Sequence, residues 1–218
     1  MFAGPTLAGV TDPAIIHAAG FTVLPPARRG DVDAVCQSYE PGQLIIVDGL
    51  FHQSLSVGHR EILTAISLGW KVWGLSSLGA IRAYELRGFG MHGFGRVYQM
   101  FNNFDDFQDD EVAMLHEAGS PYRAASEPLV HLRAAIHAFV QGKLLSRENA
   151  DTVCLRLKAQ WFGDRTIDLF ETELVAAADS ENVPCIRKHL RDFSRFRVKS
   201  LDLIDFARDY RSLQNAKY

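Results

Sequence analysis

The sequence predicts an α/β protein with a parallel, Rossmann-like sheet that is flanked by helices and followed by an α-helical C-terminal part. In the first part of the chain, apolar runs too short for helices alternate with segments of helical periodicity, at intervals of roughly twenty residues. Such alternation is typical of βαβ units, whose strands run parallel. From about Glu127 onward only helical periodicity remains. We therefore expect an α/β core domain over residues 1–126 and a helical subdomain packed on it over residues 127–218.

Length and composition indicate an ordinary globular protein. The chain has 218 residues, of which 47% are hydrophobic and 22% are charged, with a formal net charge of −3. This composition excludes general disorder, and the charge gives no basic field that would attract nucleic acid. The three cysteines have no paired spacing, which is typical of reduced, buried thiols in a cytoplasmic protein. The opening residues lack the features of a signal peptide and no apolar run approaches the ~18 residues that span a membrane, so we expect a cytoplasmic protein without a membrane partner.

Four short apolar runs are the expected strands, and each is closed by glycine, proline, aspartate or serine. They lie at residues 1–3, 22–24, 44–47 and 71–75. The segments between them show helical periodicity, and we expect helices at residues 12–19, 31–39 and 56–68.

Residues 88–95 hold four glycines interleaved with phenylalanine, methionine and histidine. The segment is too rich in glycine for a helix and too apolar for an ordinary exposed loop. Two interpretations stay open, a loop folded over a site and a crossover packed on the core. A dinucleotide fingerprint is not expected, because the glycines neither follow a clear strand nor open a helix.

The C-terminal part carries three apolar stripes at helical spacing, which we interpret as the core-facing sides of helices. Their residues are Ala150, Val153, Leu157 and Trp161; Ile167, Phe170, Leu174 and Ala177; and Leu203, Ala207, Tyr210 and Leu213. Pro184 stands where it can begin a further helix.

The expected site lies at the carboxyl ends of the four strands, because ligands of open parallel sheets bind at that edge. Turn chemistry explains much of the glycine, proline and aspartate there, but not the number of ionisable groups that converge on one edge. The residues that we expect to bind an anion or the substrate are Thr6, Asp31, Gly79, Arg82 and Glu85. Those that we expect to be catalytic are Asp48, His59, Glu61 and Ser77.

Ser77 lies between a strand and a helix, with Gly79 two residues later, and so resembles part of a nucleophile elbow. In such a turn the hydroxyl is exposed, while amides at the helix start, together with Arg82, could hold an oxyanion. The other interpretation, which the local pattern favours, is that Ser76 or Ser77 only caps the helix. Arg82 can also form an ion pair within the helix with Glu85, three residues later.

His59 and Glu61 open the third expected helix, as candidates for a base and the group that orients it. Because they are two residues apart on a helix, they point to different faces. His59 could instead meet Asp48 or Ser77 across the sheet edge. As an isolated histidine it is equally compatible with a surface or packing role.

An acidic cluster follows, with Asp105 and Asp106 and then Asp109, Asp110 and Glu111. Such runs are usually solvated, and the second group can also begin a helix, where acids suit the helix dipole. The alternative is that Asp109, Asp110 and Glu111 hold a cation such as Mg²⁺ or supply a catalytic acid. The presence of a metal stays open at this point.

Seven motifs follow one another between residue 1 and about residue 115. They are Gly4-Pro5-Thr6-Leu7; Pro25-Pro26 with Gly30-Asp31; Ile45-Ile46-Val47-Asp48-Gly49-Leu50-Phe51; His59-Arg60-Glu61-Ile62-Leu63; Gly74-Leu75-Ser76-Ser77-Leu78-Gly79-Ala80-Ile81-Arg82-Ala83-Tyr84-Glu85-Leu86; Phe89-Gly90-Met91-His92-Gly93-Phe94-Gly95; and Asp109-Asp110-Glu111-Val112-Ala113. Each motif alone is weak, but taken in this order they resemble the TfuA-like family.

Members of that family are partners of YcaO-type ATP-dependent enzymes, which make thioamides in peptide backbones. The resemblance implies that this chain binds a ThiS-like sulfur carrier protein, promotes hydrolysis of the carrier's C-terminal thiocarboxylate and releases sulfide beside the YcaO enzyme. No cofactor is expected in this chain, because ATP and Mg²⁺ would serve the partner. The alternative is a non-catalytic adaptor that docks the carrier onto the YcaO enzyme. The peptide substrate and homo-oligomerisation stay open.

Hydrolysis of a thiocarboxylate needs attack on an acyl carbon, stabilisation of an oxyanion and departure of sulfide. Ser77 could attack directly, or a base such as His59 could activate water. A persulfide relay is not expected, because it would need an exposed, activated cysteine. A third function, a small-molecule hydrolase that uses the Ser77 turn, would act on simple thioesters or esters without a carrier.

Overall fold

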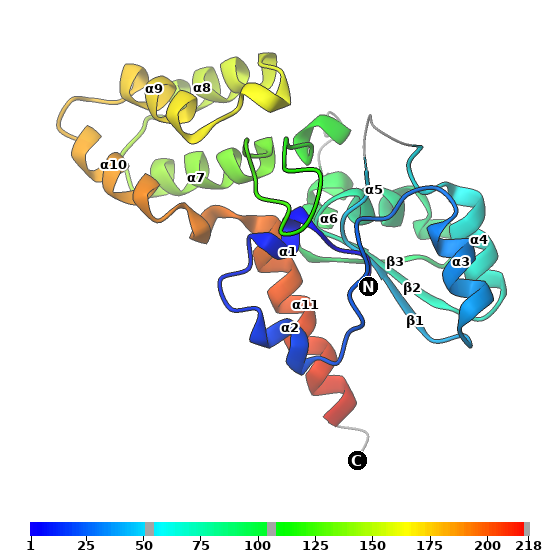
Figure 1. Cartoon of the computed structure of the whole chain (residues 1–218). Helices are drawn as coiled ribbons and strands as arrows, with labels where there is room; N and C mark the ends of the chain where they lie inside the picture. Colours follow the sequence, from blue (N-terminus) through cyan, green and yellow to red (C-terminus); the bar gives the residue numbers. More distant parts are fainter. Residues whose placement is uncertain (51–54, 104–107, 216–218) are drawn as a thin grey trace. The chain divides into compact units, whose positions relative to one another are not determined.

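The computed structural model describes residues 1–50, 55–103 and 108–215. The chain divides into two compact units, one made of residues 1–109 with residues 199–218 and the other of residues 110–198 (Figure 1). These bounds differ from the division expected between residues 126 and 127. The main difference is the last helix, whose apolar face packs in the first unit.

The first unit is built on a parallel sheet. Its strands are β1 (Gln43–Ile46), β2 (Lys71–Leu75) and β3 (His92–Phe94), hydrogen-bonded in the order β1-β2-β3. Single parallel bridges join Phe2 to Ile46 and to Leu24, so the two N-terminal runs continue the sheet beyond β1. The spatial order of these five segments is therefore 2-1-3-4-5 in chain order, as in doubly wound sheets, and the predicted α/β class is confirmed.

The last helix, α11 (Val198–Asn215), covers one face of this sheet. Side chains at alternate strand positions point to opposite faces, and Ile45 and Leu75 share an apolar cluster with Leu203 and Phe206 of α11. The Phe206 ring also lies 5.5 Å from that of Trp73, between centroids. Leu203, Ala207 and Tyr210 of the predicted stripe thus pack in this cluster, which is why the helix belongs to the first unit, whereas the side chain of Leu213 lies outside the part that the structure describes.

The remaining helices of the first unit follow the strands. They are α1 (Pro5–Ala8), α2 (Ala14–Ala18), α3 (Asp31–Ser38), α4 (His59–Ser67), α5 (Leu78–Glu85), the 3₁₀ turn η1 (Arg87–Phe89) and α6 (Gly95–Asn103). Helices α3 and α4 lie side by side (Figure 1). Helix α5 packs on the sheet face opposite to α11. Neighbouring positions of a strand face opposite sides of the sheet, so Gly74 faces away from the side on which Leu75 packs, and Gly74 closely approaches Gly79 of α5.

The glycine-rich segment at 88–95 forms an edge strand rather than a loop. It contains the last two residues of η1, the whole of β3 and the first residue of α6. Gly90 and Gly95 adopt φ values of +95° and +91°, which favour glycine. A Cβ on Gly93 would lie 2.2 Å from the ring of Tyr98, so the glycine lets this ring pack on the strand. The sequence pattern does not reveal β3, because three residues are too few to show a period.

The second unit is helical, as the sequence predicts for this part of the chain. Its α-helices are α7 (Leu129–Gln141), α8 (Arg147–Ala159), α9 (Ile167–Ala177) and α10 (Val183–Arg191), with the 3₁₀ turns η3 (Phe162–Asp164) and η4 (Phe193–Phe196). A further 3₁₀ turn, η2 (Asp109–Glu111), spans the boundary between the two units in the sequence. The side chains of Ser146 and Thr166 cap α8 and α9, and Pro184 lies in the first turn of α10. Trp161 is 57% exposed, because α8 ends before it.

Most of the two stripes predicted for α8 and α9 lie in one apolar core. The buried stripe residues in this core are Ala150, Val153, Leu157, Phe170 and Leu174. Ile167 and Ala177 of the stripes pack against them. Within the described ranges, no helix combines the length and apolarity needed to cross a membrane.

We expect Gly79→Ala to lower the free energy of unfolding by about 3 kcal/mol or more, because the new Cβ would lie 1.8 Å from the backbone oxygen of Ile46, which cannot move aside without shifting β1. Urea unfolding measures this loss. Gly88→Ala is the control, since nothing lies within 4 Å of its Cβ, and it should change the stability by less than about 0.5 kcal/mol. Equal stability of the two variants would contradict the close approach of α5 to the sheet.

Candidate functional site

The turn between β2 and α5 carries backbone strain at Ser76. This residue adopts φ +66°, in the left-handed region that non-glycine residues rarely occupy. Its hydroxyl is buried and donates a hydrogen bond of 2.8 Å to the carbonyl oxygen of Lys199 in α11. The strained position of the predicted elbow is therefore Ser76, not Ser77. The signal for it is Gly74-Leu75-Ser76, which matches the first three positions of the elbow motif.

Ser77 is the residue before α5 and is only 4% exposed. Its carbonyl oxygen accepts the amide of Ala80 at 2.9 Å, but its hydroxyl does not cap the helix. Within the described parts of the chain, that hydroxyl makes no hydrogen bond. The hydroxyl is thus neither the predicted cap nor the exposed group that a nucleophile elbow presents.

The amide of Gly79 is occupied. It donates a hydrogen bond of 3.1 Å to the carbonyl oxygen of Val47, at the end of β1. This bond and the close approach of Gly79 to the Ile46 oxygen join the start of α5 to the sheet. The amide that sequence analysis expects to bind an anion is therefore used in the fold.

Asp48 and Thr6 form a buried polar cluster at two neighbouring strand ends. One oxygen of the Asp48 carboxylate accepts the amides of Gly4 at 2.8 Å and Thr6 at 2.9 Å, and the other accepts the Thr6 hydroxyl at 2.6 Å. Both side chains are almost fully buried. The carboxylate thus satisfies amides at the start of α1, so Asp48 is positioned as a structural cap rather than as a partner of His59.

Glu61 ties together the starts of two helices. Its Oε1 accepts the amide of Gly58 at 2.7 Å, and its Oε2 accepts those of Gly30 at 3.0 Å and Val32 at 3.3 Å. The carboxylate is buried, so these amides occupy it. Asp31 acts locally, since it accepts the Arg28 amide at 3.0 Å in an exposed turn.

His59, Arg82 and Glu85 come together on the surface. The same oxygen of Glu85, Oε2, lies 2.6 Å from His59 Nε2 and 2.6 Å from Arg82 Nη1. Arg82 is held from its other side by Nε, which donates to the Val57 carbonyl at 3.0 Å. The side chains of His59, Glu85 and Arg82 are 50%, 36% and 16% exposed. We call these three residues the His59 cluster.

The charges of the His59 cluster keep Glu85 ionised. Burial raises the pKa of Glu85, but the hydrogen bonds and charges of His59 and Arg82 outweigh it, so that the pKa lies below its usual value. The cluster therefore presents a half-exposed imidazole that is oriented by a carboxylate, which is an arrangement typical of a general base.

Ser77 and Glu85 lie at opposite ends of α5. Ser77 precedes the helix, whereas Glu85 ends it eight residues later. At a rise of about 1.5 Å per residue this separates them by roughly 12 Å. Among the predicted site residues, the structure thus joins His59 with Arg82 and Glu85 and joins Thr6 with Asp48. Glu61 binds the amides on either side of Asp31, and Ser77 and Gly79 share the start of α5.

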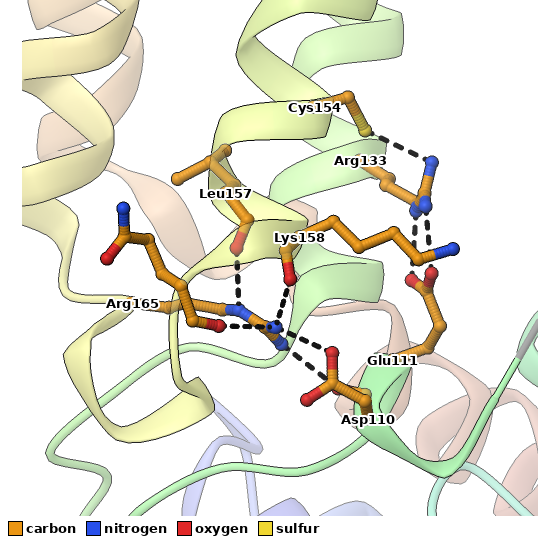
Figure 2. A network of polar contacts seen from close by, with 8 residues as sticks. Asp110, Glu111, Arg133, Cys154, Leu157, Lys158 and Arg165 are labelled. Atoms are coloured by element: carbon orange, nitrogen blue, oxygen red, sulfur yellow. Dashed lines mark hydrogen bonds and ion pairs between the residues drawn. The ribbon is translucent and has the colours of Figure 1, made fainter.

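In the second unit, two arginines occupy the carboxylates of the acidic cluster (Figure 2). Glu111 accepts two hydrogen bonds from Arg133, of 2.8 and 2.9 Å. Asp110 accepts Arg165 Nη2 at 2.6 Å. Asp109 is exposed, and residues Asp105 and Asp106 lie outside the described ranges. Pairing with arginine is a structural use of these acids and disfavours a cation at Asp110 and Glu111.

Arg165 is fully buried and closes the end of α8. Its guanidinium donates to the carbonyl oxygens of Leu157 at 3.0 Å, Gln160 at 2.9 Å and Lys158 at 3.3 Å, and also to the carbonyl of Asp110 at 3.1 Å (Figure 2). Carbonyls in the last turn of a helix have no partner within it, and a planar guanidinium can satisfy several of them at once.

Potential metal ligands are dispersed within the described ranges, and burial disfavours the thiolate form of two of the cysteines. No group of three or more histidine, cysteine, aspartate or glutamate side chains there could hold a metal ion. The three cysteines are free, and burial raises the pKa of the thiols of Cys36 and Cys154. A raised pKa opposes formation of the thiolate, which is the reactive form.

We expect Asp48→Asn to destabilise the fold by about 3 kcal/mol, because an amide has one acceptor oxygen and would place its own N–H groups against buried donors. Thermal and urea unfolding measure this effect. Asp12→Asn is the control, since Asp12 accepts one exposed amide, that of Ala14, and asparagine caps equally well; its effect should stay below about 0.5 kcal/mol. A fully stable Asp48→Asn would argue against a structural cap.

We expect Arg165→Met to lower the stability by about 3–5 kcal/mol, because it leaves a carboxylate and several buried carbonyls without donors. Urea unfolding followed by circular dichroism measures the loss of helix. The matched change Arg187→Met removes only an exposed ion pair with Glu171 and should cost less than about 1 kcal/mol. Similar losses in both variants would show that Arg165 does not close α8.

The comparison with protein families finds one match. The description of the TfuA-like protein family fits residues 48–166, which is more than half of the chain and includes His59, Ser77, Arg82 and Glu85. A search of curated proteins finds no match. The extent of the family match supports the resemblance carried by the sequence motifs, and the chain belongs to the TfuA-like family.

Proposed function

We propose that this chain binds a ThiS-like sulfur carrier and promotes hydrolysis of its C-terminal thiocarboxylate, supplying sulfide to a YcaO enzyme that forms backbone thioamides. Membership of the TfuA-like family is the observation that carries this proposal. ATP and Mg²⁺ would act in the YcaO partner. The chain's own task would then be to bind the carrier tail and to bring a base and a cation to the acyl carbon.

The His59 cluster supports this function by its chemistry and its exposure. It combines an imidazole, an oriented carboxylate and a guanidinium within hydrogen-bond distance of one oxygen atom. The imidazole is half exposed, so the end of a protein tail can reach it without entering a deep cavity. The charges of Arg82 and Glu85 cancel, and an anionic thiocarboxylate is therefore not repelled by the cluster.

One observation favours the second candidate, a non-catalytic adaptor that docks the carrier onto the YcaO enzyme. Asp48 and Glu61, two of the expected catalytic residues, have their carboxylates filled by backbone amides and a hydroxyl of the fold. Ser77 is buried and lies at the start of α5, whereas Glu85, the partner of His59, ends that helix. If the His59 cluster serves only to bind the carrier, the chemistry belongs to the partner.

We expect the purified chain to accelerate conversion of a thiocarboxylated ThiS-like carrier to its carboxylate by at least about tenfold, because a positioned base and cation lower the barrier by more than about 1.4 kcal/mol. Intact-mass spectrometry follows the carrier, and a sulfide assay measures the product released. The same carrier with an ordinary C-terminal carboxylate serves as the control for binding.

Binding without acceleration would identify an adaptor and reject the hydrolytic function. Hydrolysis of simple thioesters at a rate equal to that of the carrier would instead indicate a small-molecule hydrolase. Addition of the YcaO enzyme and its peptide should then give thioamide formation that depends on this chain, and independence from it would contradict the proposed delivery of sulfide.

A further inference from the structure

The second unit carries its acidic and basic side chains in separate segments. Residues 166–186 hold five acids and no lysine or arginine, whereas residues 187–197 hold five lysines and arginines and one acid. The basic segment covers the C-terminal half of α10 and the whole of η4. A basic surface therefore forms in a chain whose formal net charge is −3, and the overall composition does not reveal it.

Ion pairs within the unit account for two of these five cations. Arg187 donates to Glu171 of α9 at 2.8 Å, and Arg197 donates to the buried Glu127 at 2.6 Å. The other three cations are exposed, and none of them makes an ion pair within the residues that the structure describes. We call these three residues the α10 face, and they are Lys188, Arg191 and Arg195.

The three cations of the α10 face lie near one another. Lys188 and Arg191 are three residues apart and lie on one side of α10, opposite the side that is buried. Burial and the charges of Arg195 and Lys188 lower the pKa of His189, so both cations lie close to its ring. The cations in the last turn of α10 also suit the helix dipole, but Arg195 lies beyond the helix and is not explained in this way.

The Arg195 guanidinium is held in place before any partner binds. Its Cζ atom lies 4.6 Å from the centroid of the Phe196 ring. This contact uses the flat face of the guanidinium and leaves the N–H groups at its edge open to carboxylates. A side chain that is already ordered loses less conformational entropy on binding, so this cation is suited to docking.

The surroundings of the α10 face favour a folded protein as its partner. An extended polyanion such as a nucleic acid would also meet the acids of α9, which contacts α10. A membrane surface would need apolar side chains beside the cations, and none of the large exposed apolar side chains in the described ranges lies on α10 or η4. A compact patch of carboxylates on a protein meets neither obstacle, and opposite charges steer such partners together.

From these observations, and resting on the proposed function, we propose that the α10 face docks this chain onto an acidic patch of the YcaO enzyme. The His59 cluster belongs to the first unit, so carrier binding and docking use different units. The carrier must leave after each hydrolysis, whereas a docked enzyme can stay bound and receive successive sulfides. A non-catalytic adaptor would need the same face.

Isothermal calorimetry of the whole chain with the YcaO enzyme tests the docking. In about 50 mM salt, where charges are weakly screened, we expect Lys188→Glu with Arg191→Glu to weaken binding about tenfold or more, because two attractive charges become repulsive. Lys71→Glu with Arg208→Glu changes the net charge equally at exposed side chains of the first unit and should leave the affinity unchanged. The charge-conserving pair Lys188→Arg with Arg191→Lys should bind as the unchanged chain does.

Two further measurements distinguish lost charge from lost structure. Arg195→Gln changes no residue of an α-helix and should weaken binding by itself, so that unfolding of α10 cannot account for the effect. Raising the salt to about 300 mM should weaken the binding of the unchanged chain and have less effect on Lys188→Glu with Arg191→Glu, because the screened attraction is already gone.

The outcomes separate this inference from the proposed function. Equal affinity of the unchanged chain and of Lys188→Glu with Arg191→Glu for the enzyme would overturn the docking face and leave the function standing. A loss of affinity for the carrier alone would assign the face to the carrier and also overturn it. Binding of an RNA or DNA oligonucleotide that this variant loses, while it keeps its affinity for the enzyme, would assign the face to nucleic acid.

Two outcomes concern the function itself. A chain that never binds the enzyme would reject the docking face and the delivery of sulfide, while carrier hydrolysis, measured without the enzyme, would be unaffected. A chain that docks through the α10 face but never accelerates hydrolysis would confirm the docking face and reject the hydrolytic function.

Discussion

The start of α5 lies in backbone contact with the ends of two strands, and the arrangement of the first unit depends on this contact. Neither Gly74 nor Gly79 has room for a Cβ, because backbone oxygens of α5 and β1 stand about 2 Å from where it would be. The Gly79 amide is bonded to the Val47 carbonyl, so the helix begins at a fixed place and direction. Because helix and strand approach so closely, only a short turn joins β2 to α5, and Ser76 in this turn adopts a strained, positive φ. A helix fixed at its start also fixes its last turn, where Arg82 and Glu85 meet His59.

Buried carboxylates in the first unit serve mainly to satisfy the amides of short helices. Asp48 does so for α1, Glu61 for α3 and α4, and Asp202 accepts the amide of Val97 in α6 at 2.9 Å. The first amides of a helix have no partner within it, and short helices therefore have a high share of such groups. A carboxylate near the carboxyl edge of a parallel sheet can look catalytic in the sequence for this reason alone. Two features distinguish the roles, namely how deeply the carboxylate is buried and how many backbone donors bind it. Glu85 is 36% exposed and is therefore a carboxylate of the first unit that can orient a base.

In the second unit, unpaired backbone groups at the end of a helix are also satisfied by a buried charged side chain, but the charge is positive. Here the unpaired groups are carbonyls at the end of α8, and the buried guanidinium of Arg165 satisfies them. Its remaining charge is balanced by Asp110, and Arg133 is balanced by Glu111 in the same way. Acids that are adjacent in sequence, and would repel one another in isolation, are thus each neutralised by a different arginine. The arginine partners therefore give Asp110 and Glu111 a structural role in the packing of the helices.

The sequence by itself determined the features that depend on neighbouring residues. Apolar runs closed by turn residues located β1 and β2, helical periodicity located the core stripes of α8, α9 and α11, and motif order indicated the TfuA-like family. Only the tertiary structure decided which groups meet. His59 and Glu85 are 26 residues apart, and Thr6 and Asp48 are 42 apart, so no local pattern reveals their pairing. Periodicity reports which face of an element is buried, whereas a side chain's role depends on which donors and acceptors the fold brings within hydrogen-bond distance, and that is set by packing between elements distant in the chain.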